Sequence, residues 1–314
     1  MNRRNFLKAA ALAGAAFTIK DSGATTLMSQ NLNSQKSSGA GNYDLVAVMG
    51  GEPAEMCRRA LAEMGGISKF VSKGQKVVIK PNIGWDKAPE FAANTNPELI
   101  GELAKQCLSA GASEVLIFDH TCDNWRKCYE NSGIEAAAKA AGARMVPADQ
   151  ESYYKPVSLT KGKILKSTKI HEAILNADVW INVPVLKNHG GANMSISMKN
   201  LMGIVWDRKF FHANNLQQCI ADISSLSKKP VLNVVDAYRL LKTNGPRGRS
   251  EADVVLSKGL FMSQDMVAID TAATNFFNQV REMPLEKVGH IANAAALKVG
   301  TMQLDKLRIK RVKI

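Results

Sequence analysis

Two segments of the chain repeat the same order of features, and this repetition constrains the fold more than any other pattern. The sequences SAGASEVLIFD at 109–119 and KAAGARMVPAD at 139–149 each read as a helix end, a glycine cap, an apolar strand and a terminal aspartate. Strands that alternate with helices at this spacing are typical of right-handed βαβ units. The sequence therefore predicts an α/β fold, with a mainly parallel sheet, Rossmann-like units and helices on both faces.

Apolar runs separated by glycine, proline and polar residues predict the order of the elements. Strands are expected at 45–49, 76–82, 114–120, 179–186, 230–236, 259–263 and 307–314, and helices at 52–64, 96–110, 134–141, 171–176, 214–226, 265–278 and 285–299. The last strand is rich in Lys and Arg, so we expect it at an edge of the sheet, where charge discourages aggregation. The polar section 150–167 is predicted to be a hairpin or an insertion, with a lobe boundary near 150–170.

The N-terminus, MNRRNFLKAAALAGAAFTIK, has the features of a targeting signal. The arginine pair Arg3 and Arg4 precedes an alanine-rich apolar run, an order that is typical of a twin-arginine export signal. An ordinary amphipathic helix is the alternative. The predicted organisation is a signal peptide at 1–24, a disordered linker at 25–42 and an α/β domain at 43–314.

Export by this route has consequences for partners and location. We expect the twin-arginine translocase as a partner during export, and the periplasm or cell envelope as the destination. Two cleavage points fit the sequence, after Ala24 and after Ala40. The apolar run is too short to cross a bilayer, so no stable membrane span is expected.

The chain carries a formal net charge of +13, and it stays basic if residues 1–24 are removed. A basic surface favours anionic partners such as lipid head groups, cell-wall polymers or nucleic acid. Nucleic acid is not expected, because no recognition motif is visible and aromatic residues make up only 6% of the chain, too few for a stacking platform. The expected partner is a small anionic ligand.

Familiar cofactor motifs are missing from the sequence. The five cysteines form no CxxC pair, and no spacing typical of zinc, iron–sulfur, dinucleotide, P-loop or serine-hydrolase sites is present. Cys122 and Cys128 are close enough in sequence for a disulfide after export, and the other three cysteines are expected to be buried free thiols. The cofactor is left unknown, with a divalent metal ion as the candidate.

The stretch 177–207 places polar residues directly after an apolar strand. Lys187 and His189 arrive where the apolar run stops, and a glycine pair follows them. A helix from 194 to 206 with a serine as its N-cap would put Lys199 in the first turn, where a positive charge is unfavourable unless an anion neutralises it. This stretch therefore indicates a binding site, and a solvated loop with an exposed lysine is the alternative.

Polar residues also follow other expected strands. Ligands of open parallel sheets bind at the carboxyl ends of the strands. The residues at the expected ends are Lys80, Asn82, Asp119, His120, Lys187, His189, Asp236 and Asp265. We expect them to point into one shared crevice, although polar strand ends are common in any α/β protein.

The residue types suggest distinct roles in such a crevice. Ammonium groups suit compact anions, imidazole exchanges protons near neutral pH, and carboxylates orient a histidine or hold a divalent cation. His212 is a second acid–base candidate beside His189. The predicted site has three parts: catalytic residues His189, Asp236 and Lys187; anion- or cofactor-binding residues Lys80, Asn82, Lys199 and Asn200; and metal ligands Asp119, His120 and Asp265.

Five motifs resemble those of a known family. They are VVIKPN at 77–82, ADVWINVPVLKNHG at 177–190, SISMKNLMG at 195–203, NVVDAY at 233–238 and SQDMVAIDTAA at 263–273. From about residue 44 to the C-terminus, the chain resembles the uncharacterised prokaryotic family known as domain of unknown function 362 (DUF362). The resemblance names no reaction, and it places ten residues at the family's motif positions: Lys80, Asn82, Asn182, Lys187, His189, Lys199, Asn200, Asp236, Asp265 and Asp270. Some relatives carry ferredoxin-type iron–sulfur cysteines in an added segment, which this sequence lacks.

Three functional hypotheses follow from these observations. The leading one is an exported enzyme that binds a small anionic substrate, a phosphate or a carboxylate, at the strand ends, with His189 as its acid–base group. The first alternative is a non-catalytic binding module for an acidic envelope ligand. The second is a metal or redox protein related to the iron–sulfur-containing members of the family, with Asp119, His120, Asp236 and Cys122 as ligands.

Overall fold

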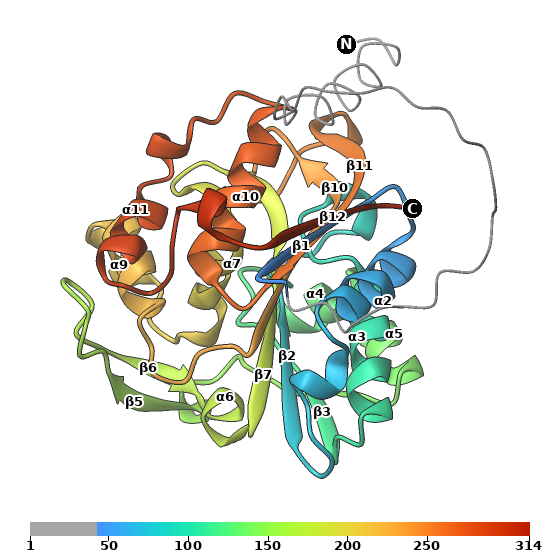
Figure 1. The fold of residues 1–314 in the computed structure, drawn as a ribbon. Coiled ribbons are helices and arrows are strands. Elements are labelled where there is room, and N and C mark those ends of the chain that lie inside the picture. Colours follow the sequence, from blue (N-terminus) through green and yellow to red (C-terminus); the bar gives the residue numbers. More distant parts are fainter. Residues whose placement is uncertain (1–42) are drawn as a thin grey trace, which may run out of the picture. The chain divides into compact units, whose positions relative to one another are not determined.

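A ten-stranded, mostly parallel sheet lies at the centre of the protein (Figure 1). The structure is a computed structural model that describes residues 43–314. The eight strands of the main row are, from edge to edge, β12 (Ile309–Lys313), β1 (Leu45–Met49), β11 (Val254–Ser263), β10 (Leu232–Leu241), β7 (Val179–Val183), β2 (Lys76–Pro81), β3 (Glu114–Ile117) and β4 (Arg144–Met145). The export signal and linker predicted at 1–24 and 25–42 lie outside the described residues.

One strand runs against all the others in the main row. β11 is antiparallel to both β1 and β10, whereas every other neighbouring pair is parallel. Ser263 at the carboxyl end of β11 therefore pairs with Leu45 at the amino end of β1. The basic strand β12 lies at an edge of the sheet, as predicted. The mainly parallel α/β architecture predicted from the sequence is confirmed.

Helices cover both faces of the sheet (Figure 1). One face carries α2 (Pro53–Glu63), α3 (Pro97–Ser109), α4 (Trp125–Asn131) and α5 (Ile134–Ala140). The other side carries α6 (Glu172–Asn176), α7 (Ser197–Asn200), α8 (Lys209–Ala213), α9 (Leu216–Ile223), α10 (Met266–Asn278) and α11 (Gly289–Ala296). Each set of helices packs apolar side chains against the sheet, and this produces two core clusters, one on each side.

Local sequence signals explain where the two longest helices begin. α3 starts with Pro97 after Asn96, whose side chain accepts a hydrogen bond from a backbone N–H of the first turn. α10 starts after Asp265, whose carboxylate accepts two such hydrogen bonds. These caps satisfy N–H groups that have no partner within the helix. Within residues 43–314, no helix has the length and apolarity that crossing a bilayer requires.

Pro184 divides the predicted central strand into β7 and β8 (Val185–His189). Proline has no N–H to donate to a strand ladder, and its carbonyl here accepts the N–H of Asp236. After the break, β8 pairs with β10 and with the short antiparallel strand β9 (Asn193–Ser195). β8 and β9 thus extend the sheet beyond the carboxyl end of β7.

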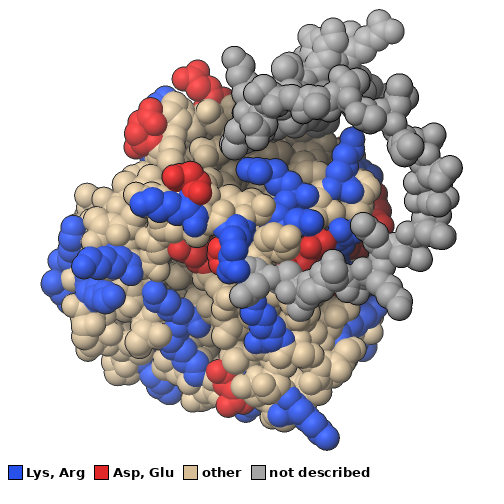
Figure 2. Space-filling model, viewed as in Figure 1, with Lys and Arg blue, Asp and Glu red and all other residues tan. Residues whose placement is uncertain are grey.

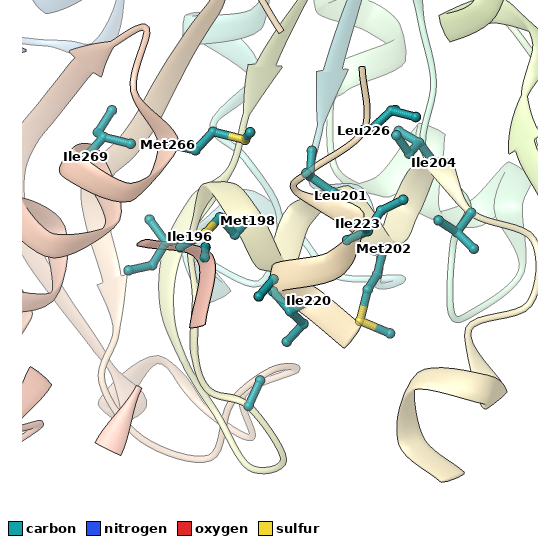
Figure 3. Close-up of a cluster of buried hydrophobic side chains, with 14 of the residues drawn as sticks. Ile196, Met198, Leu201, Met202, Ile204, Ile220, Ile223, Leu226, Met266 and Ile269 are labelled. Atoms are coloured by element: carbon teal, nitrogen blue, oxygen red, sulfur yellow. The ribbon is translucent and has the colours of Figure 1, made fainter. Parts of the chain in front are cut away.

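The segment after β9 forms a shorter helix than predicted. α7 has four residues and continues as a 3₁₀ turn at Leu201–Ile204. The apolar side chains of this segment lie among those of α9 and α10 (Figure 3). No serine side chain caps it. Instead, Asp270 of α10 accepts the N–H groups of Ser197 and Met198 at 2.9 and 3.0 Å.

The polar section 150–167 contains part of an antiparallel hairpin. Its strands are β5 (Tyr154–Ser158) and β6 (Ser167–His171). A hairpin was one of the two forms that the sequence allowed, and the lobe boundary near 150–170 stays a prediction.

The disulfide considered between Cys122 and Cys128 is absent. Both residues are free thiols, and Cys122 is exposed whereas Cys128 is buried. The two side chains therefore lie in different environments. The other three cysteines are buried free thiols, as predicted.

The capping role of Asp270 is open to a direct test. We expect Asp270→Ala to lower the free energy of unfolding by about 2–6 kcal/mol, because two buried N–H groups lose their acceptor at about 1–3 kcal/mol each. Denaturant unfolding followed by circular dichroism measures the change. Asp305→Ala removes an exposed carboxylate and is the control, with an expected change within about 0.5 kcal/mol. Equal effects in the two variants would contradict the role of Asp270.

Candidate functional site

A cavity of about 1330 Å³ opens where β2, β3 and β8 end. Its walls come from these strand ends, from the segment that spans α7 and α8, and from the β5–β6 hairpin. Eight of the ten predicted site residues line it: Lys80, Asn82, Asp119, His120, Lys187, His189, Lys199 and Asn200. Most of the expected strand ends therefore meet, as the parallel topology requires.

Lys80, near the end of β2, is fully buried. Its ammonium group forms an ion pair with Asp119 at 2.9 Å. It also donates to the carbonyl and side-chain oxygens of Asn200 at 2.7 and 2.8 Å. Burial lowers the pKa of Lys80, and the charge of Asp119 opposes this shift. The three acceptors match the three N–H donors of the ammonium group.

Lys187 on β8 is also buried, but its partners are neutral. Its Nζ donates to Oδ1 of Asn82 at 3.0 Å and to the carbonyl of Ala93. Burial lowers the pKa of Lys187 to about 7. Near neutral pH the residue is therefore a mixture of ammonium and amine.

Lys199 on α7 lines the cavity and makes no hydrogen bond or ion pair within residues 43–314. Burial lowers its pKa to about 8, and the positive charges of Arg208 and Lys80 act in the same direction. Asp119 offers little compensation, because it is already paired with Lys80. Lys199 thus presents an unpartnered amine or ammonium group to the cavity.

A row of asparagine side chains connects Lys187 to the middle of the sheet. Asn82 donates to Asn200 at 3.1 Å, and Asn200 donates to Asn182 at 2.9 Å. Asn182 then donates to Asn233 at 3.0 Å. Each amide gives its N–H to the next amide oxygen, which leaves Oδ1 of Asn82 to accept from Lys187. Such a fully satisfied buried network fixes the position of the lysine.

His189 is a neutral hydrogen-bond donor in this geometry. Its Nδ1 accepts the backbone N–H groups of Gly191 and Ala192, both at 3.1 Å, which places the ring proton on Nε2. Burial lowers the pKa of His189 to about 2, and the charges of Lys199 and Lys187 act in the same direction. His189 is therefore suited to binding an anionic oxygen, and less suited to the acid–base role predicted from the sequence.

His120, after β3, has the opposite tautomer. Its Nδ1 donates to the carbonyl of Val205 at 2.9 Å, so Nε2 carries the lone pair when the ring is neutral. The ring stacks on Trp206, with centroids 5.0 Å apart and an interplanar angle of 2°. Burial lowers its pKa. His120 is thus the better proton acceptor, whereas His212, which also lines the cavity, is exposed.

Arg208 contributes a cation to the cavity that sequence reasoning missed. Its guanidinium group donates to the carbonyls of His120 and Thr121 at 2.7 Å each. It lines the cavity and has no ion pair with a carboxylate within the described part of the chain. A single arginine outside any motif carries no signal that would have identified it.

Two predicted site carboxylates lie away from the cavity. Asp236 is in the middle of β10 rather than at its end, and it accepts the N–H groups of Asn96 and Tyr238 at 2.7 and 3.0 Å. Asp265 follows the antiparallel strand β11, whose carboxyl end lies beside the amino end of β1. Asp265 is therefore on the side of the sheet where the parallel strands begin, away from the cavity at their carboxyl ends. It caps α10 and accepts the N–H of Thr301 at 2.9 Å. Both carboxylates have structural partners, and their positions do not support the predicted catalytic and metal-binding roles.

The predicted metal ligands do not come together. Within residues 43–314, no three His, Cys, Asp or Glu side chains gather closely enough to hold a metal ion. Asp119 pairs with Lys80, His120 uses Nδ1 to bind a carbonyl, and Asp265 lies at the other edge of the sheet.

Gly203 makes room for the Lys80–Asp119 ion pair. A Cβ atom at this position would lie 1.9 Å from Oδ1 of Asp119 and 2.4 Å from Nζ of Lys80. Its carbonyl also accepts the N–H of His120 at 3.1 Å. Gly203 ends the motif SISMKNLMG, but the need for a close approach is visible only in the folded chain.

Comparisons with known proteins identify the family. The family described as "Domain of unknown function (DUF362)" matches residues 77–275. The chain belongs to this family. A protein similar in sequence, "Thylakoid-associated protein sll1697" of Synechocystis sp., is 26% identical over 226 residues, which cover 69% of this chain and 68% of that protein.

Two solved structures resemble the chain at low sequence identity. The lactate racemase apoprotein from Thermoanaerobacterium thermosaccharolyticum gives a TM-score of 0.49 at 14% identity, over 77% of this chain and 58% of that chain. A protein from Thermotoga maritima gives a TM-score of 0.42 at 10% identity, over 59% of this chain and 51% of that chain. The DUF362 chain thus spans little more than half the length of either structure.

Gly203 offers a test of the buried ion pair. We expect Gly203→Ala to separate Lys80 from Asp119 and to lower the free energy of unfolding by about 3–5 kcal/mol, the range for a buried charge that loses its partner. Gly101→Ala on α3 is the matched control, because its Cβ would meet neighbours only at 3.5 Å or more. Its expected effect ranges from neutral to a stabilisation of about 1 kcal/mol. Denaturant unfolding that shows no loss in Gly203→Ala would refute the packing argument.

Proposed function

We propose that this DUF362 protein is an enzyme whose small anionic substrate, carrying a phosphate or a carboxylate, binds in the cavity. An excess of positive charge on buried and partly buried lysines carries the proposal. Among the described residues that line the cavity, Lys80, Lys187 and Lys199 share one buried carboxylate, that of Asp119. Buried charge without a partner costs several kcal/mol, and a bound anion removes this cost.

The groups available to the anion come from β8 and α7. Lys199 offers all its hydrogen-bonding capacity, and Lys187 has only neutral acceptors. His189, which also lines the cavity, adds the N–H of Nε2. Hydrogen bonds between ammonium groups and anionic oxygens are about twice as strong as neutral ones. These three side chains form the proposed anion grip.

Proton transfer is assigned to His120 and Lys187. The free Nε2 of His120 accepts a proton, and Lys187, with a pKa of about 7, donates or accepts one near neutral pH. General acid–base catalysis works best when the pKa lies near the operating pH. The geometry therefore supports moving the acid–base role from His189 to these residues.

The size of the cavity indicates a substrate with more than an anionic group. Ligand sites usually occupy roughly 300–1,000 Å³, and this cavity measures about 1330 Å³. Trp85, Trp206 and Phe210 lie along its walls, which suits a substrate whose remaining part is apolar or planar.

On the face in Figure 2, Lys and Arg are dispersed among Asp and Glu, so the cavity concentrates positive charge better than this surface does. Export by the twin-arginine route remains part of the proposal.

The pH dependence of anion binding tests the lysine grip. We expect sulfate to raise the melting temperature most at about pH 6 and to lose this effect as the pH rises past about 8, because Lys187 and Lys199 lose their charge near their pKa values of about 7 and 8. Sulfate stays a dianion over this range, so only the protein titrates. Differential scanning fluorimetry against chloride at equal ionic strength measures the shift.

Without an anion, the contribution of these two lysines to stability changes with pH in the opposite direction. The folded-state pKa values lie below the ordinary value of 10.5, so the folded chain binds fewer protons than the unfolded chain between about pH 7 and 10.5. The destabilisation by these lysines is complete below about pH 7 and fades as the pH rises. A sulfate effect that grows with pH would sink the proposal.

Single substitutions separate the cavity from the general charge of the protein. We expect Lys199→Gln to weaken sulfate binding about tenfold, which corresponds to about 1.4 kcal/mol, because one charge-assisted hydrogen bond is lost. Lys105→Gln removes an exposed lysine of α3 that does not line the cavity, and it should bind as the parent does. Titration by fluorimetry compares the two, and equal losses would indicate non-specific charge attraction.

A further inference from the structure

Lys199, which is partly buried, differs from the buried lysines Lys80 and Lys187 in what surrounds its nitrogen. Lys80 directs its N–H groups at a carboxylate and at two oxygens of Asn200. Lys187 directs its N–H groups at two neutral oxygens. Lys199 has no such partner within residues 43–314, and it lines the cavity. Of these three lysines, Lys199 is therefore the one whose nitrogen is available for a new bond.

The surroundings also favour the neutral amine of Lys199. Burial and the charges of Arg208 and Lys80 lower its pKa to about 8, although Cys122 and Asp119 act in the opposite direction. Asp119 is held by Lys80 at 2.9 Å, so it does not form a salt bridge that would fix Lys199 as an ammonium ion. A desolvated amine beside other cations is the nucleophile that forms Schiff bases with carbonyl compounds.

We propose that Lys199 forms an imine with the carbonyl group of an anionic oxo acid bound in the cavity. This inference rests on the proposed function and narrows its substrate class to anionic carbonyl compounds. Nζ bonds to the carbonyl carbon, and the carbonyl oxygen leaves as water with the two hydrogens of the amine. The product contains a C=N bond, and the step needs no oxidant or reductant.

Neighbouring residues have matching tasks. Lys187 and the Nε2–H of His189 bind the acid group, because both line the same cavity as Lys199. The free Nε2 of His120 takes up the proton that the nitrogen loses when the C–N bond forms and returns it to the oxygen that leaves as water. A protonated imine withdraws electrons from the adjacent carbon. The site is therefore suited to reactions that make or break a bond next to the carbonyl carbon.

Reductive trapping tests the imine. The full chain is incubated with glyoxylate, or with acetaldehyde as a carbonyl compound without the acid group, and then reduced with borohydride. Hydride adds to the imine carbon and leaves a stable secondary amine, which peptide mass spectrometry locates. We expect glyoxylate to modify Lys199 about tenfold more than Lys105, and acetaldehyde to show a smaller preference, because only glyoxylate has an acid group for the anion grip to bind.

The variant Lys199→Arg keeps the positive charge and lacks the amine. It should lose the selective adduct at residue 199, and circular dichroism confirms that it folds. Sulfate stabilisation of the parent without a glyoxylate adduct on Lys199 overturns the imine and leaves the proposed function standing. Absence of stabilisation by any anion removes the proposed function as well. An adduct centred on Lys187, or spread evenly over surface lysines, overturns the assignment to Lys199.

Discussion

The ion pair between Lys80 and Asp119 is the contact on which the cavity depends. It joins the ends of β2 and β3, and the second oxygen of Asp119 accepts the N–H of Ile83 at 2.7 Å. Lys80 also holds Asn200, so the ion pair positions α7 as well. Gly203 leaves the space that this arrangement needs. Removing one partner would strand a buried charge, a change that costs about 3–5 kcal/mol in comparable cases.

A second constraint comes from the two sides of α7. Asp270 of α10 binds its first N–H groups, and the amide of Asn182 on β7 binds the carbonyl of Ser197 and accepts from Asn200. A helix of four residues has little stability of its own. The contacts from α10 and β7 therefore fix the backbone that carries Lys199 to the cavity.

The sequence predicted those features that depend on local pattern. β1 was expected at 45–49, and the structure has it at Leu45–Met49. Apolar runs bounded by glycines depend on local sequence, so they predict such elements well. The convergence of Lys80, Lys187 and His189 followed from parallel topology. The prediction that Asp265 lines the same crevice was wrong, because β11 runs antiparallel to its neighbours. The direction of a strand depends on long-range pairing, which the local sequence does not show. The roles of His189 and His120 depend on which backbone groups bind Nδ1, and no sequence motif records that contact.

The choice of lysine at the cavity is itself informative about chemistry. Arginine binds carboxylate and phosphate with two parallel hydrogen bonds and stays charged when buried, so it is the better residue for anion binding alone. The cavity instead places buried or partly buried lysines at Lys80, Lys187 and Lys199, and its arginine, Arg208, is anchored to backbone carbonyls. Only lysine loses its proton when it is desolvated, and only its amine acts as a base or nucleophile. Lys187 and Lys199 therefore fit the proposed reaction better than simple retention of an anion.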